Sequence, residues 1–223
     1  YIYIEHGAHY AIGVLAIIFL GMVIYRNTAN KSNVTVQEVE QIEEYISKIY
    51  MWKEITKEAL PTFENINNAN ELWLWEVIKK NLETYETTYE EIQQKGKELF
   101  GEKFEKQIPK EGNDSFYYDK ESNKYLATEI VLDEEEDSFL LKDIEKEGEK
   151  YKVKIIEYIE DYSEENKVII RNLKEEEIGR VSTTDSETKI KEIVKNNKER
   201  FSQKNIEIKK EKDNLVIEKV NKE

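Results

Sequence analysis

The chain has 223 residues, no cysteine and a formal net charge of −14, and 37% of its residues are charged while 39% are hydrophobic. The lack of cysteine excludes disulfides, thiolate zinc sites and a cysteine nucleophile, and the negative charge disfavours binding to nucleic acid or anionic lipid. The hydrophobic fraction is sufficient for a packed core, so the sequence predicts a globular domain rather than a disordered polyampholyte.

An uncharged apolar segment opens the chain. Residues 7–25 contain no Asp, Glu, Lys or Arg, and as a helix they would be about 28 Å long, which matches the hydrocarbon core of a bilayer. Tyr10 and Tyr25 lie near its two ends, where aromatic rings prefer the headgroup region, and Arg26 follows directly. We therefore predict that residues 1–25 form a short head and a transmembrane helix, with Tyr10, Tyr25 and Arg26 at the membrane interface.

A secretory signal is the alternative interpretation of the same segment, with cleavage after the small-residue site at residues 27–29. Residues 26–34 are polar and without periodicity, which is typical of a tether. We expect the domain beyond the tether to lie outside the cytoplasm, as in many single-span proteins with a short head. Arg26 and Lys31, counted alone, would favour the opposite orientation.

Helical patterns begin the predicted domain, which we place at residues 35–223. Thr35 and Glu38 form a capping-box pattern, and apolar residues follow at three- and four-residue steps. A second long helix is predicted over residues 71–92, whose apolar positions form one continuous stripe: Leu74, Ile78, Leu82, Tyr85, Tyr89 and Ile92. A shorter helix is expected near residues 97–106, so that residues 35–108 are mainly helical.

From residue 114 to the end of the chain the pattern is mainly that of strands. Strands and hairpins are predicted at residues 116–118, 125–132, 139–144, 151–162, 167–173, 205–210 and 215–220. One further helix is expected near residues 186–201. Helices followed by an antiparallel sheet indicate an α+β fold, in which two long helices pack on the apolar face of a curved sheet.

This order of elements resembles that of membrane-anchored NTF2-like or cystatin-like domains of Gram-positive bacteria, including the VirB8-like subunits of conjugation and secretion machines. The resemblance covers most of the chain, and residues 71–92 and 151–162 are its clearest patterns. The helix predicted near residues 186–201 departs from the simplest form of that fold. The resemblance implies a cavity between sheet and helices as one possible ligand site.

Aromatic residues supply the candidate surface for a ligand or a partner. Trp52, Trp73, Trp75, Tyr85 and Tyr89 are suited to line a concave pocket, although packing in the core is the commoner role of such residues. Trp73 and Trp75 are two positions apart on the predicted helix and so face different directions. This spacing predicts that at least one of the two reaches a partner or the membrane surface.

Motifs that carry chemistry are incomplete throughout the sequence. Asp119, Glu121 and Asn123 alternate as at the start of a calcium loop, but lysine and isoleucine occupy the later positions where glycine and glutamate are needed. The acidic run at residues 133–137 is more typical of a solvated loop than of a cation site. Residues 96–101 have the outer glycine spacing of a phosphate loop without its lysine and serine or threonine.

We therefore expect no metal site, no catalytic residue and no cofactor. The sequence favours a non-enzymatic protein-interaction or assembly domain of the bacterial cell envelope. Its expected partners are the membrane and other envelope proteins, not nucleic acid, and its oligomeric state is left open. A small-ligand-binding or weakly enzymatic pocket bordered by the aromatic residues is the alternative hypothesis.

Overall fold

A computed structural model describes residues 34–128, 135–185 and 187–223. These parts of the chain form an α+β fold with five α-helices and two antiparallel sheets. The helices are α2 (Val36–Ile49), α3 (Lys53–Thr56), α4 (Glu71–Lys80), α5 (Tyr89–Phe100) and α6 (Glu187–Asn196), with 3-10 turns η1 (Ile66–Asn68) and η2 (Lys198–Arg200).

The larger sheet has six strands and is built around one long central strand. Its strands are β4 (Glu135–Glu147), β5 (Lys150–Asp161), β6 (Lys167–Arg171), β7 (Glu177–Ser182), β8 (Ser202–Glu211) and β9 (Asn214–Lys222). The order is β7-β6-β5-β8-β9, and β4 pairs with β5 along its whole length. Because β5 bonds β8 through its first residues and β6 through its last three, it holds both halves of the sheet together.

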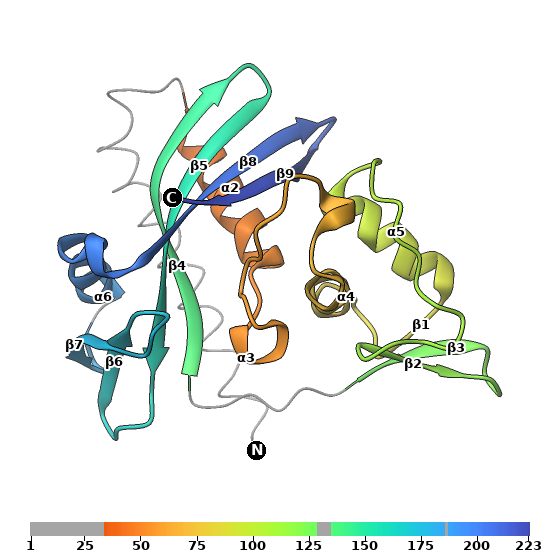
Figure 1. The fold of residues 1–223 in the computed structure, drawn as a ribbon, viewed down its shortest axis with the longest axis horizontal. Helices are drawn as coiled ribbons and strands as arrows, with labels where there is room; N and C mark the ends of the chain where they lie inside the picture. The colour runs from red at the N-terminus through yellow and green to blue at the C-terminus, as the bar shows by residue number, and fades with distance from the viewer. Residues whose placement is uncertain (1–33, 129–134, 186) are drawn as a thin grey trace.

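The smaller sheet has three short strands, β1 (Glu86–Thr87), β2 (Phe116–Asp119) and β3 (Lys124–Ala127), in the order β1-β3-β2. Figure 1 shows it at the end of the molecule opposite β6, β7 and α6, with α4 and α5 between it and the larger sheet. The strands of one sheet therefore do not pair with those of the other.

One hydrophobic core joins these layers. It contains Trp73 and Leu74 of α4 together with side chains from α2, α5, both sheets and the loops, all of them buried. Every residue of α4 from Trp73 to Ile78 is buried, which is the pattern of a helix surrounded by protein on all sides.

The prediction of two long helices packed on a curved sheet is wrong. The longest described helix, α2, has 14 residues, and the helix predicted over residues 71–92 is divided into α4 and α5 with β1 between them. Asn81 caps the C-terminus of α4, and Thr88 and Glu91 form a second capping box that starts α5. Three threonines between the helices favour extended backbone, which explains why the apolar stripe does not continue as one helix.

The predicted transmembrane helix lies in residues 1–25, outside the described residues, as do Tyr10, Tyr25 and Arg26. Among the helices of the described ranges, none is both long enough and apolar enough to cross a bilayer.

Candidate functional site

The two tryptophans of α4 lie in the core, and neither reaches the surface. Trp73 is fully buried and Trp75 is 5% exposed. The Trp73 Nε1 donates hydrogen bonds to the carbonyls of Ile49 (3.1 Å) and Ala59 (3.2 Å), and its ring packs against Phe100 with centroids 5.6 Å apart. Protein therefore covers α4 at both tryptophan positions.

The remaining predicted aromatic residues do not gather around one cavity. Trp52 is half-buried, and the Lys80 ammonium lies 5.3 Å from the centre of its ring while donating to the Tyr50 carbonyl. Tyr89 is half-buried in the first turn of α5, whereas Tyr85 is 56% exposed just before β1. Of the five residues, only Tyr85 therefore offers a largely exposed ring.

One carboxylate of the larger sheet, that of Glu157 in β5, is buried in the core. Its Oε1 lies 3.1 Å from Lys204 Nζ and accepts a hydrogen bond from the Tyr50 hydroxyl (3.3 Å), and its Oε2 accepts from the Ser202 hydroxyl (3.1 Å). Lys204 also donates to the Leu60 carbonyl. Glu157 is fully buried and Lys204 is 2% exposed, so the pair has its hydrogen-bond partners and no access for a substrate.

The acidic run is only partly described, and its described residues begin β4. Glu135 and Glu136 lie opposite Asp161 and Glu160 of β5, and the Asp137 carboxylate accepts a hydrogen bond from the Lys53 backbone N–H (2.6 Å). Burial raises the pKa of Asp137. Within the described ranges, no group of three or more acidic or histidine side chains has the arrangement of a metal site.

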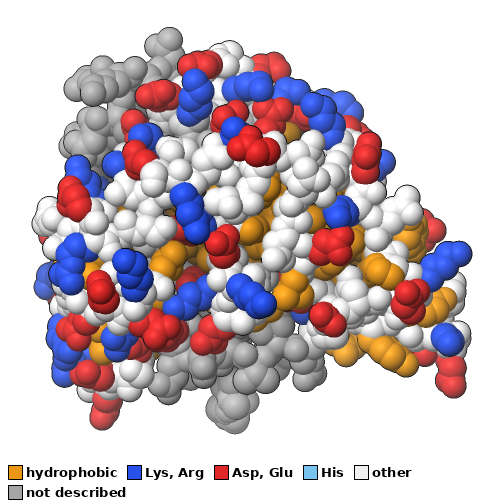
Figure 2. Space-filling view, in the orientation of Figure 1, with side chains coloured by type: hydrophobic (Ala, Val, Ile, Leu, Met, Phe, Trp, Pro, Cys, Tyr) orange, Lys and Arg blue, Asp and Glu red, His pale blue; other side chains and the backbone are white. Residues whose placement is uncertain are grey.

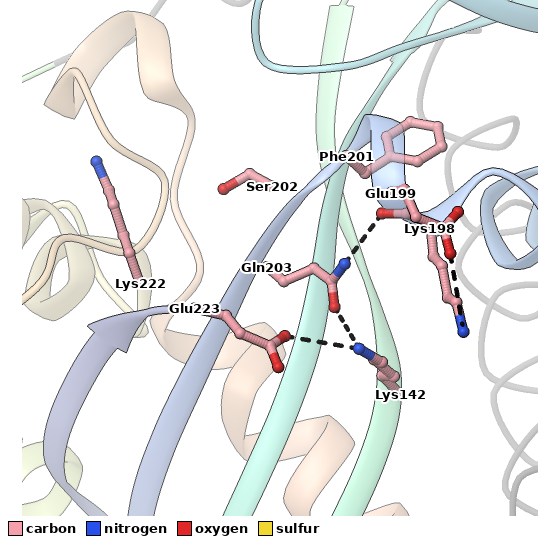
Figure 3. Close-up of a pocket in the computed structure, with 8 residues that line it drawn as sticks. All are labelled: Lys142, Lys198, Glu199, Phe201, Ser202, Gln203, Lys222 and Glu223. Atoms are coloured by element: carbon pink, nitrogen blue, oxygen red, sulfur yellow. Dashed lines mark hydrogen bonds and ion pairs between the residues drawn. The ribbon is translucent and has the colours of Figure 1, made fainter.

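A surface hollow of about 410 Å³ lies beside η2 and the ends of β8 and β9 (Figure 3). The Lys142 ammonium is held there between the Gln203 Oε1 (2.5 Å) and the Glu223 carboxylate (3.5 Å). Lys198 and Glu199 of η2 form a long ion pair of 4.0 Å at its edge. Apart from Phe201, the lining residues are polar or charged, with both signs of charge present, and they include none of the aromatic residues predicted to form a pocket.

The three-stranded sheet has one covered and one open face because its side chains alternate. Phe116 and Tyr125 point inward and are almost fully buried, and the Tyr125 hydroxyl donates to the Pro109 carbonyl (3.1 Å). Tyr117 lies opposite Leu126 on the outer face and is 63% exposed. We call this outer side the Tyr117 face, and by strand register it consists of Glu86, Tyr117, Asp119, Lys124 and Leu126.

Charged groups at fixed positions border the apolar pair on the Tyr117 face. Lys124 Nζ lies 2.9 Å from Glu86 Oε2, and this hydrogen bond raises the pKa of Lys124. The Asp119 carboxylate accepts from the Ser122 hydroxyl (2.5 Å) and from backbone N–H groups of the β2–β3 turn, which lowers the pKa of Asp119. Asp119 therefore stabilises the hairpin turn between β2 and β3.

Figure 2 shows hydrophobic side chains at the surface of this corner of the molecule, with acidic and basic side chains beside them. Of the three large hydrophobic side chains exposed among the described residues, Tyr85 and Tyr117 belong to this region, and Tyr162 lies just after β5. Tyr85 is one of the residues that the sequence predicts for a contact surface, whereas Tyr117 is not. The available signal was the strand pattern of residues 116–118, in which the middle residue must face away from its neighbours.

Residues 96–101 form the end of α5 rather than a phosphate loop. Gly101 follows the last helical residue with φ of +86°, a conformation that glycine adopts readily, and its N–H closes the helix on the Lys97 carbonyl. The two glycines therefore belong to helix packing and helix termination.

No protein-family model, curated protein or solved structure matched the chain in the three comparisons. The function proposed below therefore depends on the sequence and on the geometry of the described residues.

Proposed function

We propose that residues 35–223 form a non-catalytic protein-interaction domain of the bacterial cell envelope, and that the Tyr117 face is its contact surface. The observation that carries this proposal is the 63% exposure of Tyr117 beside Leu126 on an open sheet face. Tyrosine is enriched in protein interfaces because a rigid ring contributes a large apolar area and its hydroxyl a hydrogen bond.

The distribution of the other aromatic residues supports an external rather than an internal binding site. Trp73, Trp75 and Phe104 pack against their neighbours in the core, with the Trp75 and Phe104 ring centroids 6.2 Å apart. The interior carboxylate of Glu157 is occupied by Lys204. A ligand pocket at these residues would require the core to open.

Attachment to the membrane is the part of the proposal that rests on residues 7–25 alone, which lie outside the described residues. A bilayer-spanning helix requires detergent for extraction. We expect the full-length chain to stay with the membrane fraction in high salt and to be released by detergent. Release by high salt without detergent would contradict the membrane anchor. That result would not bear on the Tyr117 face, which has its own test.

The contact surface can be tested by photo-crosslinking in cells of the source organism. A photoreactive phenylalanine analogue is placed at Tyr117, at Leu126 or, as a control, at Tyr162, which is also exposed but lies outside the Tyr117 face. We expect adducts with the same protein from positions 117 and 126 and not from position 162. Equal labelling at all three positions, or none at 117, would contradict the proposal.

A further inference from the structure

The surroundings of the Tyr117 face are more acidic than the rest of the chain. The segments that carry the three strands, residues 83–91 and 110–128, contain eight acidic residues and three lysines, a net charge of −5. Per residue, this is roughly three times the average negative charge of the whole chain. Charge of one sign around an apolar contact selects partners of the opposite sign.

Most of these acidic residues are exposed. Seven of the eight are exposed: Glu83, Glu86, Glu90, Glu91, Glu111, Asp114 and Glu121. In the described part of the chain, only Glu86 forms an ion pair, with Lys124. A hydrogen bond from the Thr88 backbone N–H lowers the pKa of Glu91.

Exposed tyrosine rings add a second feature that favours cations. The face of a tyrosine ring attracts lysine and arginine side chains, and guanidinium groups stack on it especially well. Tyr117 is 63% exposed, and Tyr85, directly before Glu86, is 56% exposed. A flat sheet with accessible rings and surrounding carboxylates therefore matches a segment that carries several basic side chains.

A second copy of this chain does not fit the same surface. It would bring another acidic surface against the first, and the whole chain has a net charge of −14. Nucleic acid and anionic lipid are disfavoured for the same reason. The negative charge therefore favours a positively charged partner over a second copy, nucleic acid or anionic lipid.

We propose that the Tyr117 face binds a lysine- and arginine-rich segment of a partner protein, with basic side chains on the Tyr117 ring and against the carboxylates of residues 83–91. This inference rests on the proposed function and adds the chemistry of the partner. The partner segment is extended or a loop, because the three-stranded sheet is too small for a large domain interface.

The test uses the full-length chain in uncharged detergent and a labelled ten-residue peptide of alternating arginine and glycine. The matched probe replaces each arginine by glutamine. We expect the arginine peptide to bind and the glutamine peptide to bind at least tenfold more weakly in fluorescence anisotropy. The Tyr117→Ser variant should lose about fivefold in affinity for the arginine peptide, as expected for one cation–π contact, while Tyr162→Ser should leave it unchanged.

Two results would overturn the inference. One is equal binding of the two peptides, and the other is an equal loss in the Tyr117→Ser and Tyr162→Ser variants, which would indicate diffuse attraction to an acidic protein. Circular dichroism of both variants checks that they remain folded. If crosslinking at Tyr117 identifies a partner whose contact segment lacks lysine and arginine, the inference fails while the proposed interaction function stands.

Discussion

The two sheets differ in which side chains they bury: the six-stranded sheet buries a charged pair, whereas the three-stranded sheet exposes an aromatic ring. In the six-stranded sheet, β5 is buried on both faces from Ile155 to Asp161, so the Glu157 carboxylate lies inside and is matched by Lys204. In the three-stranded sheet, only the face with Phe116 is covered, and Tyr117 points outward without burial. One sheet places charge inside and the other leaves an aromatic ring outside.

This difference separates stability from binding. A buried ion pair with all its hydrogen bonds is costly to break, because the remaining charge is left without water or a partner. An exposed ring contributes little to the stability of the fold, because its apolar area is buried only when a partner binds. We therefore expect substitutions in the larger sheet and at α4 to change stability, and those on the Tyr117 face to change binding.

The largest effect is expected from a matched pair of aromatic truncations. Trp73→Ala should reduce the free energy of unfolding by about 5 kcal/mol, because it empties a core position and removes the buried hydrogen bond to the Ile49 carbonyl. Tyr117→Ala should change it by less than about 0.5 kcal/mol. Urea unfolding followed by tryptophan fluorescence and circular dichroism measures both, and comparable losses would remove the distinction between the two regions.

The interior ion pair comes next. Lys204→Met leaves the fully buried Glu157 carboxylate without its cation, and we expect the free energy of unfolding to fall by about 3–5 kcal/mol. The double variant Glu157→Leu, Lys204→Met removes both charges and should lose less than the single lysine variant. Chemical unfolding of the two single variants and the double variant gives the coupling energy. Additive losses would mean that the two side chains do not act as a pair.

Much of the fold could be predicted from local patterns, and the error at residues 71–92 has a physical cause. The Thr35–Glu38 capping box and the β4–β5 and β8–β9 hairpins form where their sequence signals lie. The apolar stripe from Leu74 to Ile92 continues past Thr88, although Thr88 and Glu91 form the same capping box as Thr35 and Glu38 at the start of α2. A start signal inside a stripe indicates two helices, and here it outweighs the periodicity.

The candidate site was harder to predict than the fold. Residues 116–118 are all aromatic, so alternation alone does not reveal which face of the strand is exposed. That depends on distant contacts, such as the one between Tyr125 and Pro109. The burial of both Trp73 and Trp75 has the same origin, because periodicity gives the direction of a side chain on α4 and not what lies in that direction.

Two glycines with positive φ, one beside each sheet, differ in the space around their Cα atoms. A Cβ at Gly112 would lie 2.3 Å from the Phe116 carbonyl oxygen, next to the bridge that joins Gly112 to Tyr117, whereas a Cβ at Gly148 in the β4–β5 turn would meet nothing within 4 Å. Gly112→Ala should therefore destabilise by about 2–3 kcal/mol and Gly148→Ala by about 1 kcal/mol. Thermal or urea unfolding gives the order, and a larger loss at Gly148 would contradict the described packing around Tyr117.

The smallest expected effect is a difference between the two capping boxes in how their contribution to stability depends on pH. Glu38 of α2 accepts hydrogen bonds from Lys146 (2.5 Å) and Tyr151 (2.7 Å) of the β4–β5 hairpin, whereas Glu91 of α5 bonds only Thr87 and Thr88 among the described residues. Burial alone would raise the pKa of Glu38, but the hydrogen bonds from Lys146, Thr35 and Tyr151 outweigh it and lower the pKa to about 2.

Because the folded-state pKa of Glu38 lies below its ordinary value of 4.5, its contribution to stability is complete above pH 4.5 and disappears as the pH falls towards 2. We expect the free energy of unfolding of the wild type to be higher than that of Glu38→Gln by about 1–2 kcal/mol at neutral pH, after allowance for solvent screening. This difference should shrink below pH 4.5. Glu91→Gln should show a smaller difference from wild type across the same pH series of urea unfolding. Equal pH dependence for the two variants would show that the link between α2 and the larger sheet adds nothing to the capping box itself.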